Sequence, residues 1–208
     1  SYVGRAVRPF QYGRQDRLKA RTELGIPADA AVVLFQPGSW TEARLPAGEM
    51  VVAGWKRLTN PRKRLLWLAG DDHDEIAGRY HADKDIVVMK PNWAVDRLLA
   101  ASDVVVIPSR WEGMALVPLE AMACARSVVA TDVNGAVDSV PSDAGAIVPL
   151  DDPASLVLAL TTRLEDEALA QEEGWQGRSH VERHHDVSAS ARELARVYLR
   201  LVGARRTS

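Results

Sequence analysis

The sequence predicts an α/β fold, a doubly wound, mainly parallel, six-stranded Rossmann-like sheet with helices on both faces and extra C-terminal helices. Three observations predict it: six short apolar runs recur, the runs are continuous rather than alternating, and amphipathic stretches separate them. Continuous apolar runs are typical of strands whose two faces are both covered by helices. Strands that alternate with helices are typical of a parallel sheet.

The expected elements follow from these patterns in order along the chain. The apolar runs predict strands at residues 31–36, 64–70, 85–90, 103–109, 127–132 and 145–149. Apolar positions three and four residues apart predict helices between them at 46–58, 93–101 and 116–123. The C-terminal part predicts amphipathic helices at 152–164, 167–183 and 187–202. In DDPAS, residues 151–155, acids and a proline in the first turn indicate a helix start.

Composition indicates one compact globular domain covering residues 1–208. Apolar residues make up 47% of the chain and charged residues 26%, which is ordinary for a globular protein. The formal net charge of −2 gives no indication of nucleic acid as a partner. The single cysteine, Cys124, excludes an internal disulfide and suits a reducing compartment. No apolar run reaches the roughly 18 residues of a transmembrane segment, so we expect a cytoplasmic protein.

A ligand is expected beyond the carboxyl ends of the strands, where the strand order of an open parallel sheet reverses. If the first strand is central and the fourth lies beside it, the loops at 37–48 and 109–116 meet there. The second loop runs directly into a helix, and its unpaired amides would form an anion site. These amides belong to Gly113, Met114, Ala115 and Leu116. Arg44 on the facing loop could add a charge-assisted donor to a diphosphate.

Two glutamates, Glu112 and Glu120, are eight residues apart in this segment. A helical rise of about 1.5 Å per residue separates their backbones by roughly 12 Å. That is wide for the two carboxyl groups of a glycosidase, which are about 5–9.5 Å apart around one bond. The spacing fits two polyhydroxyl rings joined by a diphosphate, because carboxylates accept strongly from hydroxyls. The pattern therefore indicates a nucleotide-sugar as ligand.

The segment PSRWEGMALVPLEAMACARSVVATDVNG, residues 108–135, resembles the E-x7-E signature of retaining GT-B glycosyltransferases, especially those of family four. The similarity extends to LGIPADAAVVLF, LLAASDVVVIPS and GAIVPLDDPASLVLAL. It therefore covers nearly the whole chain as the C-terminal, donor-binding domain of that fold. The resemblance implies retaining transfer from a UDP-, GDP-, ADP- or TDP-sugar to an acceptor that the sequence does not define. It also implies that no cofactor is permanently bound and that no metal is required.

The resemblance assigns roles at matching positions. Glu112 corresponds to the glutamate near the donor sugar, Glu120 to the one that accepts from the ribose, and residues 113–116 to the sugar-diphosphate cradle. The family has a G-R-x-x-x-x-K segment after the first strand, which supplies two cations to the diphosphate. Here Gly38 is followed by Ser39 in place of the arginine, and Arg44 takes the lysine position.

The resemblance thus makes Glu112 and Arg44 the candidate catalytic residues, with one cation fewer than usual for the leaving diphosphate. Lys90 and Pro91, after the third strand, are candidate neighbours of the nucleobase. Milder departures are Ala115, where glycine is usual, and CARS at residues 124–127, where the family commonly has a Gly-x-Pro turn.

The resemblance also implies a partner that this chain lacks. GT-B enzymes have two Rossmann-like domains, and the N-terminal one binds the acceptor. We therefore expect the 208-residue chain to be a donor domain without transferase activity by itself. Two other classes of function stay open: a nucleotide-sugar 2-epimerase or phosphorylase on the same scaffold, and a non-catalytic nucleotide-sugar binding module, which the loss of the arginine at Ser39 favours.

Three further motifs are interpreted structurally. GDDHDE, residues 70–75, has the residue types of a metal site, but acids at a helix start are more often a cap. Asn134 and Gly135, after the fifth strand, are expected to form a turn beside the ligand. His184 and His185 are adjacent in a polar stretch and cannot share one helical face, which indicates a solvated surface.

Overall fold

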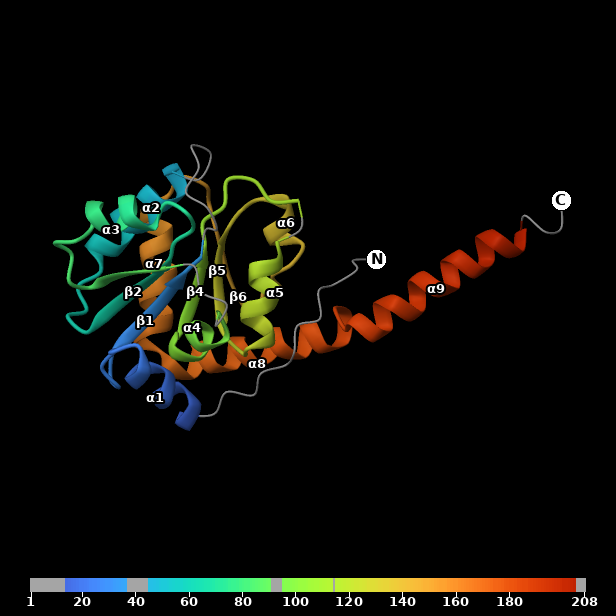
Figure 1. The fold of residues 1–208 in the computed structure, drawn as a ribbon, viewed down its shortest axis with the longest axis horizontal. Helices are drawn as coiled ribbons and strands as arrows, with labels where there is room; N and C mark the ends of the chain where they lie inside the picture. Colours follow the sequence, from blue (N-terminus) through green and yellow to red (C-terminus); the bar gives the residue numbers. More distant parts are fainter. Residues whose placement is uncertain (1–13, 37–44, 91–94, 114, 205–208) are drawn as a thin grey trace.

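The chain folds into a parallel α/β sheet in a computed structural model that describes residues 14–36, 45–90, 95–113 and 115–204. One six-stranded sheet has the order β3-β2-β1-β4-β5-β6, and all its pairings are parallel (Figure 1). The strands are β1 (Ala31–Phe35), β2 (Lys63–Leu68), β3 (Ile86–Met89), β4 (Val104–Ile107), β5 (Ser127–Thr131) and β6 (Gly145–Val148). This confirms the predicted fold class, and each predicted strand is present with ends shifted by at most two residues.

Helices cover both faces of the sheet. In chain order they are α1 (Arg14–Glu23), α2 (Leu45–Arg57), α3 (His73–Arg79), α4 (Val95–Ala101), α5 (Leu116–Ala123), α6 (Asn134–Val137), α7 (Pro153–Glu165), α8 (Glu167–His184) and α9 (Val187–Ala204). Along β1, Val32 and Leu34 pack into a core with α1, α4, α5 and α8. Val33 and Phe35 pack into a second core with α2, α3 and α7. Both faces are therefore buried, which is why the strand sequences are continuously apolar.

Three helices differ from the expectation. α1 lies where no helix is predicted, because its sequence RQDRLKARTE has little apolar periodicity. α6 takes the place of the turn expected at Asn134 and Gly135. α3 begins inside GDDHDE, where only a helix start is inferred, because its short length offers too few apolar positions to define a period.

The predicted start of α7 is confirmed in detail. The Asp152 carboxylate accepts hydrogen bonds from the backbone amides of Ala154 and Ser155, and Pro153 occupies the first turn. Hydrogen bonding to Ser155 holds the pKa of Asp152 below its usual range. This arrangement satisfies amide groups that have no partner within the helix.

The turn after α5 contains CARS, residues 124–127, where the resemblance leads one to expect a Gly-x-Pro turn. Ala125 has a φ of 53°, in the left-handed region that favours glycine. Its neighbour Cys124 is buried, as packing predicts, and burial raises the pKa of the thiol to about 12. An alanine thus takes a left-handed conformation in this turn, at the expense of some backbone strain.

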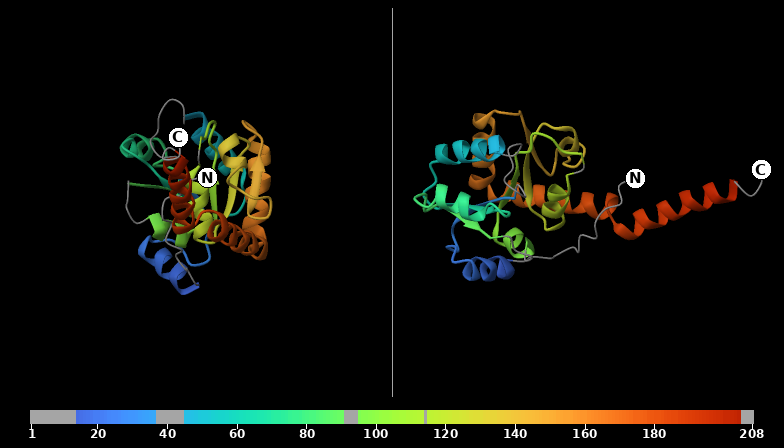
Figure 2. Two further views of the ribbon diagram at one scale, coloured as in Figure 1. Left: turned by 90° about the vertical axis from the view of Figure 1, so that its right-hand side faces the viewer. Right: turned by 45° about the horizontal axis from the view of Figure 1, so that its top comes forward.

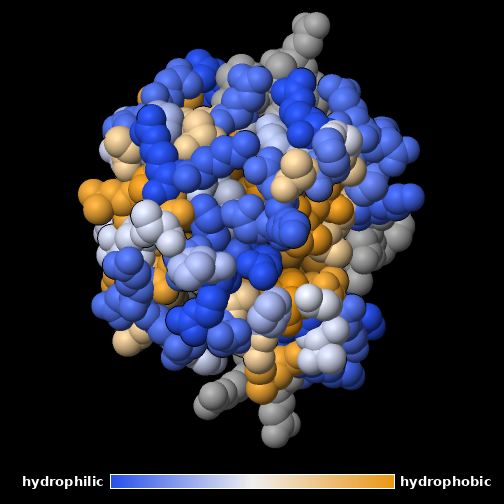
Figure 3. Space-filling view, turned by 90° about the vertical axis from the view of Figure 1, so that its left-hand side faces the viewer, coloured by the Kyte–Doolittle hydropathy of each residue, from blue (hydrophilic) through white to orange (hydrophobic). Residues whose placement is uncertain are grey.

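The last helix, α9, extends away from the body of the domain (Figure 1 and the right-hand view of Figure 2). Exposed large apolar side chains recur along it mostly three and four residues apart, and so form a stripe. The stripe consists of Leu194, Val197, Tyr198, Leu201 and Val202, and Leu199 is exposed as well. By contrast, hydrophilic residues cover most of the side that faces left in Figure 1, with apolar residues in small separate areas (Figure 3). Within the described residues, no helix is long and apolar enough to cross a lipid bilayer.

Candidate functional site

The strand order reverses between β1 and β4, which lie side by side at the centre of the sheet. The chain leaves β1 toward β2 on one side and leaves β4 toward β5 on the other, so the two connections diverge at their carboxyl ends. This is the position where parallel sheets bind ligands. The segment 37–44 after β1 lies outside the described residues. The described part of the site is therefore the loop after β4.

A chain of hydrogen bonds fixes the loop that carries Glu112. The Ser109 hydroxyl donates to Oε1 of Glu112 over 2.6 Å. The hydroxyl of Thr131, at the end of β5, donates in turn to the backbone carbonyl of Ser109. Thr131 is fully buried, and Glu112 is half-buried. The glutamate is therefore oriented by a side chain that is itself held against the neighbouring strand.

An ion pair ties the same loop to the connection after β6. Arg110 pairs with Asp151, and that contact raises the pKa of the Arg110 guanidinium. Asp151 has a φ of 57° and directly precedes the cap of α7. Between Arg110 and Glu112, the Trp111 side chain is 82% exposed. The loop thus has anchors on β5 and beyond β6, and presents an indole ring to solvent.

Gly135, in the first turn of α6, closes the loop from behind. A Cβ atom at Gly135 would lie 2.7 Å from the Glu112 carbonyl oxygen, 2.9 Å from the Glu112 Cβ and 2.9 Å from the Gly113 carbonyl oxygen. Real Cβ atoms do not approach backbone atoms so closely. Glycine is required here because α6 packs directly on the backbone of the Glu112 loop, as its predicted place beside the ligand suggests.

We expect Gly135→Ala to displace this loop and to weaken ligand binding at it. The added methyl group meets backbone rather than a flexible side chain, so the loop or α6 has to move, at a cost of about 1–3 kcal/mol in stability. Thermal unfolding and ligand titration of the variant measure the two effects. Gly78→Ala is the matched control, since a Cβ at Gly78 has nothing within 4 Å. Unchanged stability and binding in Gly135→Ala would show that the contact is not constraining.

The loop leads into α5 through Ala115, whose φ of −76° and ψ of 105° any residue adopts. The alanine in place of the family glycine therefore puts no strain on the backbone. No side chain among the described residues caps the first turn of α5. Pro118 has no amide hydrogen, which leaves the amides of Leu116 and Val117 as the donors of that turn. The end of the helix can therefore bind an anion.

Glu120 lies inside α5 and is half-buried between the buried residues Leu119 and Ala121. The helix begins only at Leu116, so the estimate of roughly 12 Å between the two glutamates, which assumed a helical rise over all eight residues, does not apply. Glu112 precedes α5, on the loop that Thr131 and Asp151 hold. Glu120 lies within α5, four residues after the helix begins at Leu116. The structure keeps the predicted order of glutamate, amides and glutamate, but along a bent path.

The other predicted site residues are either farther from Glu112 or outside the described part of the chain. Lys90 is exposed and follows β3, at the same edge of the sheet. Three strand spacings separate β3 from β4, about 14 Å in all. Five predicted residues lie outside the described part of the chain: Gly38, Ser39, Arg44, Pro91 and Met114.

The acids of GDDHDE form a local arrangement around the start of α3. Asp72 is the residue before the helix, but its carboxylate accepts from the Gly70 amide over 3.0 Å and bonds no helix amide. Nδ1 of His73 lies 2.8 Å from the Asp74 carboxylate, and this contact lowers the pKa of Asp74. Within residues 14–36, 45–90, 95–113 and 115–204, no group of three or more potential ligands is arranged to hold a metal ion. Asp72 thus occupies the expected cap position of α3, but its side chain does not bond the amides of the helix.

Sequence reasoning missed the supports of the site. Ser109 and Glu112 have the S-x-x-E spacing of a capping box, which was a usable signal. The contacts of Thr131 and of Asp151 with the loop span 22 and 41 residues, and no local pattern indicates them.

The fold and the site define a Rossmann-like domain with an uncapped helix start at the carboxyl edge of its sheet. Comparison with known proteins identifies the family. The model for glycosyl transferases group 1 matches residues 34–166. A D-inositol 3-phosphate glycosyltransferase of Kineococcus radiotolerans is 35% identical over 181 residues, which cover 73% of this chain and 40% of that protein.

Solved structures show the same fold. Sucrose-phosphate synthase from Thermosynechococcus elongatus has a TM-score of 0.82 and 26% identity over 97% of this chain and 52% of its own. Anabaena HepE, solved in complex with UDP-glucose, has a TM-score of 0.81 and 19% identity over 94% of this chain and 55% of its own.

The chain therefore belongs to the glycosyl transferases group 1 family. It spans about two fifths of the length of the glycosyltransferase from Kineococcus radiotolerans.

Proposed function

We propose that this chain is the donor-binding domain of a retaining GT-B glycosyltransferase of the E-x7-E type, and that it binds a nucleotide-diphosphate sugar at the carboxyl edge of its sheet. One observation carries the proposal: the pinned loop 109–113 delivers Glu112 and uncapped helix amides together at the point where strand order reverses. The UDP-glucose complex of HepE, which has the same fold, supports a uridine donor.

In this proposal each described residue has a separate task. Glu112 accepts from hydroxyls of the donor sugar, and Ser109 fixes its orientation. The amides of Leu116 and Val117 stabilise the negative charge that grows on the departing diphosphate, because preorganised dipoles act where charge develops. Glu120 accepts from the ribose hydroxyls. Arg44 is proposed as the cation on the diphosphate, by resemblance to the family lysine.

The acceptor is proposed to come from a second, N-terminal domain beyond this chain. The exposed apolar stripe on α9 supports a further contact surface, because such stripes commonly mark interfaces. On this proposal the 208-residue chain binds the donor and transfers no sugar by itself. Detection of sugar transfer by the purified chain would contradict that part of the proposal.

We expect Glu120→Ala to weaken donor binding by about 1–3 kcal/mol, because charged hydrogen bonds to the ribose are lost. Isothermal titration calorimetry with UDP-glucose measures the change. Glu172→Ala is the control, since Glu172 is an exposed helical glutamate that accepts from Gln176, four residues along α8. Equal affinities of the two variants and the unchanged protein would contradict the role of Glu120.

A thermal-shift screen of UDP-, GDP-, ADP- and TDP-sugars identifies the donor, because a ligand that binds the folded state raises the melting temperature. We expect one nucleotide to give a distinctly larger shift than the others. The alternative activity as a 2-epimerase is tested with the donor alone, since epimerisation needs no acceptor. A changed sugar after that incubation would favour the epimerase over the transferase.

A further inference from the structure

The amino-terminal end of the sheet, opposite to the proposed donor site, carries a cavity. It has a volume of about 850 Å³ and is lined by residues of α1, of the segment before β1, of the turn before β5, and of α8. A smaller cavity of about 260 Å³ adjoins it and shares Arg17, Arg126 and Glu167 with it. The larger volume is within the range of small-molecule sites.

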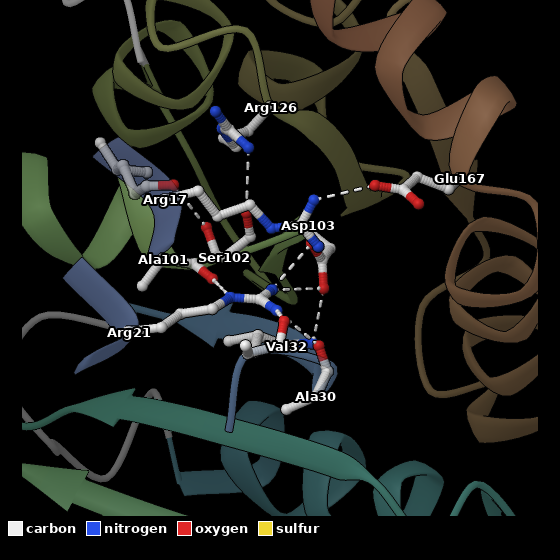
Figure 4. A network of polar contacts seen from close by, with 11 residues as sticks. Arg17, Arg21, Ala30, Val32, Ala101, Ser102, Asp103, Arg126 and Glu167 are labelled. Atoms are coloured by element: carbon white, nitrogen blue, oxygen red, sulfur yellow. Dashed lines mark hydrogen bonds and ion pairs between the residues drawn. The ribbon is translucent and has the colours of Figure 1, made fainter. Parts of the chain in front are cut away.

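A network of arginines and carboxylates forms the floor of this region (Figure 4). The Asp103 carboxylate accepts from Nη2 of Arg21 over 3.0 Å at both oxygens, and from the Val32 amide over 2.8 Å. Arg17 pairs with the same carboxylate and with Glu167. The remaining donors of Arg21 reach backbone carbonyls of Ala101, Ala28 and Ala30.

Arg126 is the cation of this network that has no carboxylate partner. Among the described residues, its guanidinium donates only to the backbone carbonyls of Cys124 and Ser102, each over 3.1 Å. Burial lowers the pKa of Arg126, Asp103 raises it, and the charges of Arg17 and Arg21 lower it further. The side chain stays protonated at any physiological pH. A half-buried positive charge therefore lines the cavity beside two further arginines.

The acids around the cavity are already paired with other cations. Asp103 and Glu167 have the partners given above, and Asp29 pairs with Arg62 over 3.1 Å. An anion that enters the cavity would thus meet Arg126 as a charge-assisted donor without displacing an existing pair.

Two large apolar side chains also line the same cavity. Trp175 is 56% exposed and Leu18 is 40% exposed, and both line it. A cavity that is lined by both an indole ring and a guanidinium favours a ligand that has a flat ring on one side and a negative group on the other. The combination depends on Arg126, which forms no ion pair among the described residues, and on the exposed ring of Trp175.

We propose that the cavity lined by Arg17, Arg126 and Trp175 is a binding site for a small ring-bearing anion, a phosphate monoester or a carboxylate. The anionic group binds Arg126, with Arg17 beside it, and the ring stacks on Trp175. The site lies at the end of the sheet opposite to the donor site, so a ligand there does not compete with a nucleotide-sugar.

Calorimetric titration of the 208-residue chain with phenyl phosphate, benzoate, inorganic phosphate and phenol tests the proposal. We expect phenyl phosphate or benzoate to bind with a dissociation constant of about 1 mM or lower, inorganic phosphate to bind more weakly, and phenol not to bind. If phenyl phosphate binds more tightly than benzoate, the site prefers a phosphate monoester, and the reverse order indicates a carboxylate.

Three variants make the test specific. Arg126→Gln should weaken binding of the ring anion about tenfold or more, and Trp175→Ala should abolish the preference for phenyl phosphate over inorganic phosphate. Arg183→Gln is the matched control, because Arg183 also donates to a backbone carbonyl, that of Ser179, but does not line the cavity. Failure of both ring anions to bind, or equal binding by Arg126→Gln, overturns the proposal.

A fourth measurement covers the case in which Arg126→Gln does not fold. Amide chemical shifts of the unchanged protein, followed during the phenyl phosphate titration, should move most around Arg17, Arg126 and Trp175. Shifts that gather instead at the start of α5 would mean that the anion binds the proposed donor site, and would also overturn the proposal.

Discussion

Asp103→Ala is expected to lower the free energy of unfolding by about 3–5 kcal/mol, because it leaves a buried arginine without its counter-charge. Arg21 has a side chain that is only 1% exposed, and Asp103 is its one carboxylate partner among the described residues. The same substitution removes the acceptor of the Val32 amide at the start of the central strand. It therefore removes the side-chain contacts that tie both α1 and the start of β1 to the residue before β4 (Figure 4).

Chemical denaturation of the variant measures this loss. Asp29→Ala is the matched control, since Asp29 is also paired with an arginine, but both partners are largely exposed. Exposed pairs contribute little to stability, so we expect the control to unfold almost as the unchanged protein does. Asp103→Asn should lose less than Asp103→Ala, because its amide oxygen can still accept from Val32. A loss for Asp103→Ala as small as that of the control would contradict this account of the network.

Gly145→Ala is expected to destabilise the fold by about 3 kcal/mol, since it forces extra volume into packed backbone. Gly145 is the first residue of β6, and a Cβ there would lie 1.9 Å from the carbonyl oxygen of Val128 in β5. The two residues are register partners, so the clash is with the strand to which β6 is paired. Relief requires that the strands move apart and lose hydrogen bonds.

Gly78→Ala, in the same chain, is expected to raise the stability rather than to lower it. Gly78 lies inside α3 with open space around it, so alanine should stabilise the helix by up to about 1 kcal/mol. Thermal unfolding of both variants in one buffer compares them directly. Similar melting temperatures for the two would show that the close approach at Gly145 relaxes at no cost.

The sheet could be predicted from the sequence because its signal is local. Runs such as AVVLF and SVVAT are apolar on both faces, and burial on both faces is what the structure gives them. The end of α5 and the cap of α7 are likewise set by adjacent residues, so the predictions 116–123 and 152–164 match or nearly match the helices found.

The parts that could not be predicted depend on contacts between distant residues. α1 is anchored by Arg21, a charged residue that becomes fully buried because Asp103 and three carbonyls meet it. Nothing near Arg21 in the sequence distinguishes it from a surface arginine. For the same reason the sequence identifies Glu112 but not the hold of Thr131 on its loop, which depends on the pairing of β4 with β5.

The central claim is that a nucleotide-sugar binds where loop 109–113 meets α5. Amide chemical-shift mapping during a UDP-glucose titration of the 208-residue chain tests it most directly. The account predicts that the largest shifts fall on residues 109–113, on Leu116 and Val117, and on Gly135 behind them. Saturable binding with its shifts confined to other regions, or no binding of any of the four nucleotide-sugar classes, would contradict it.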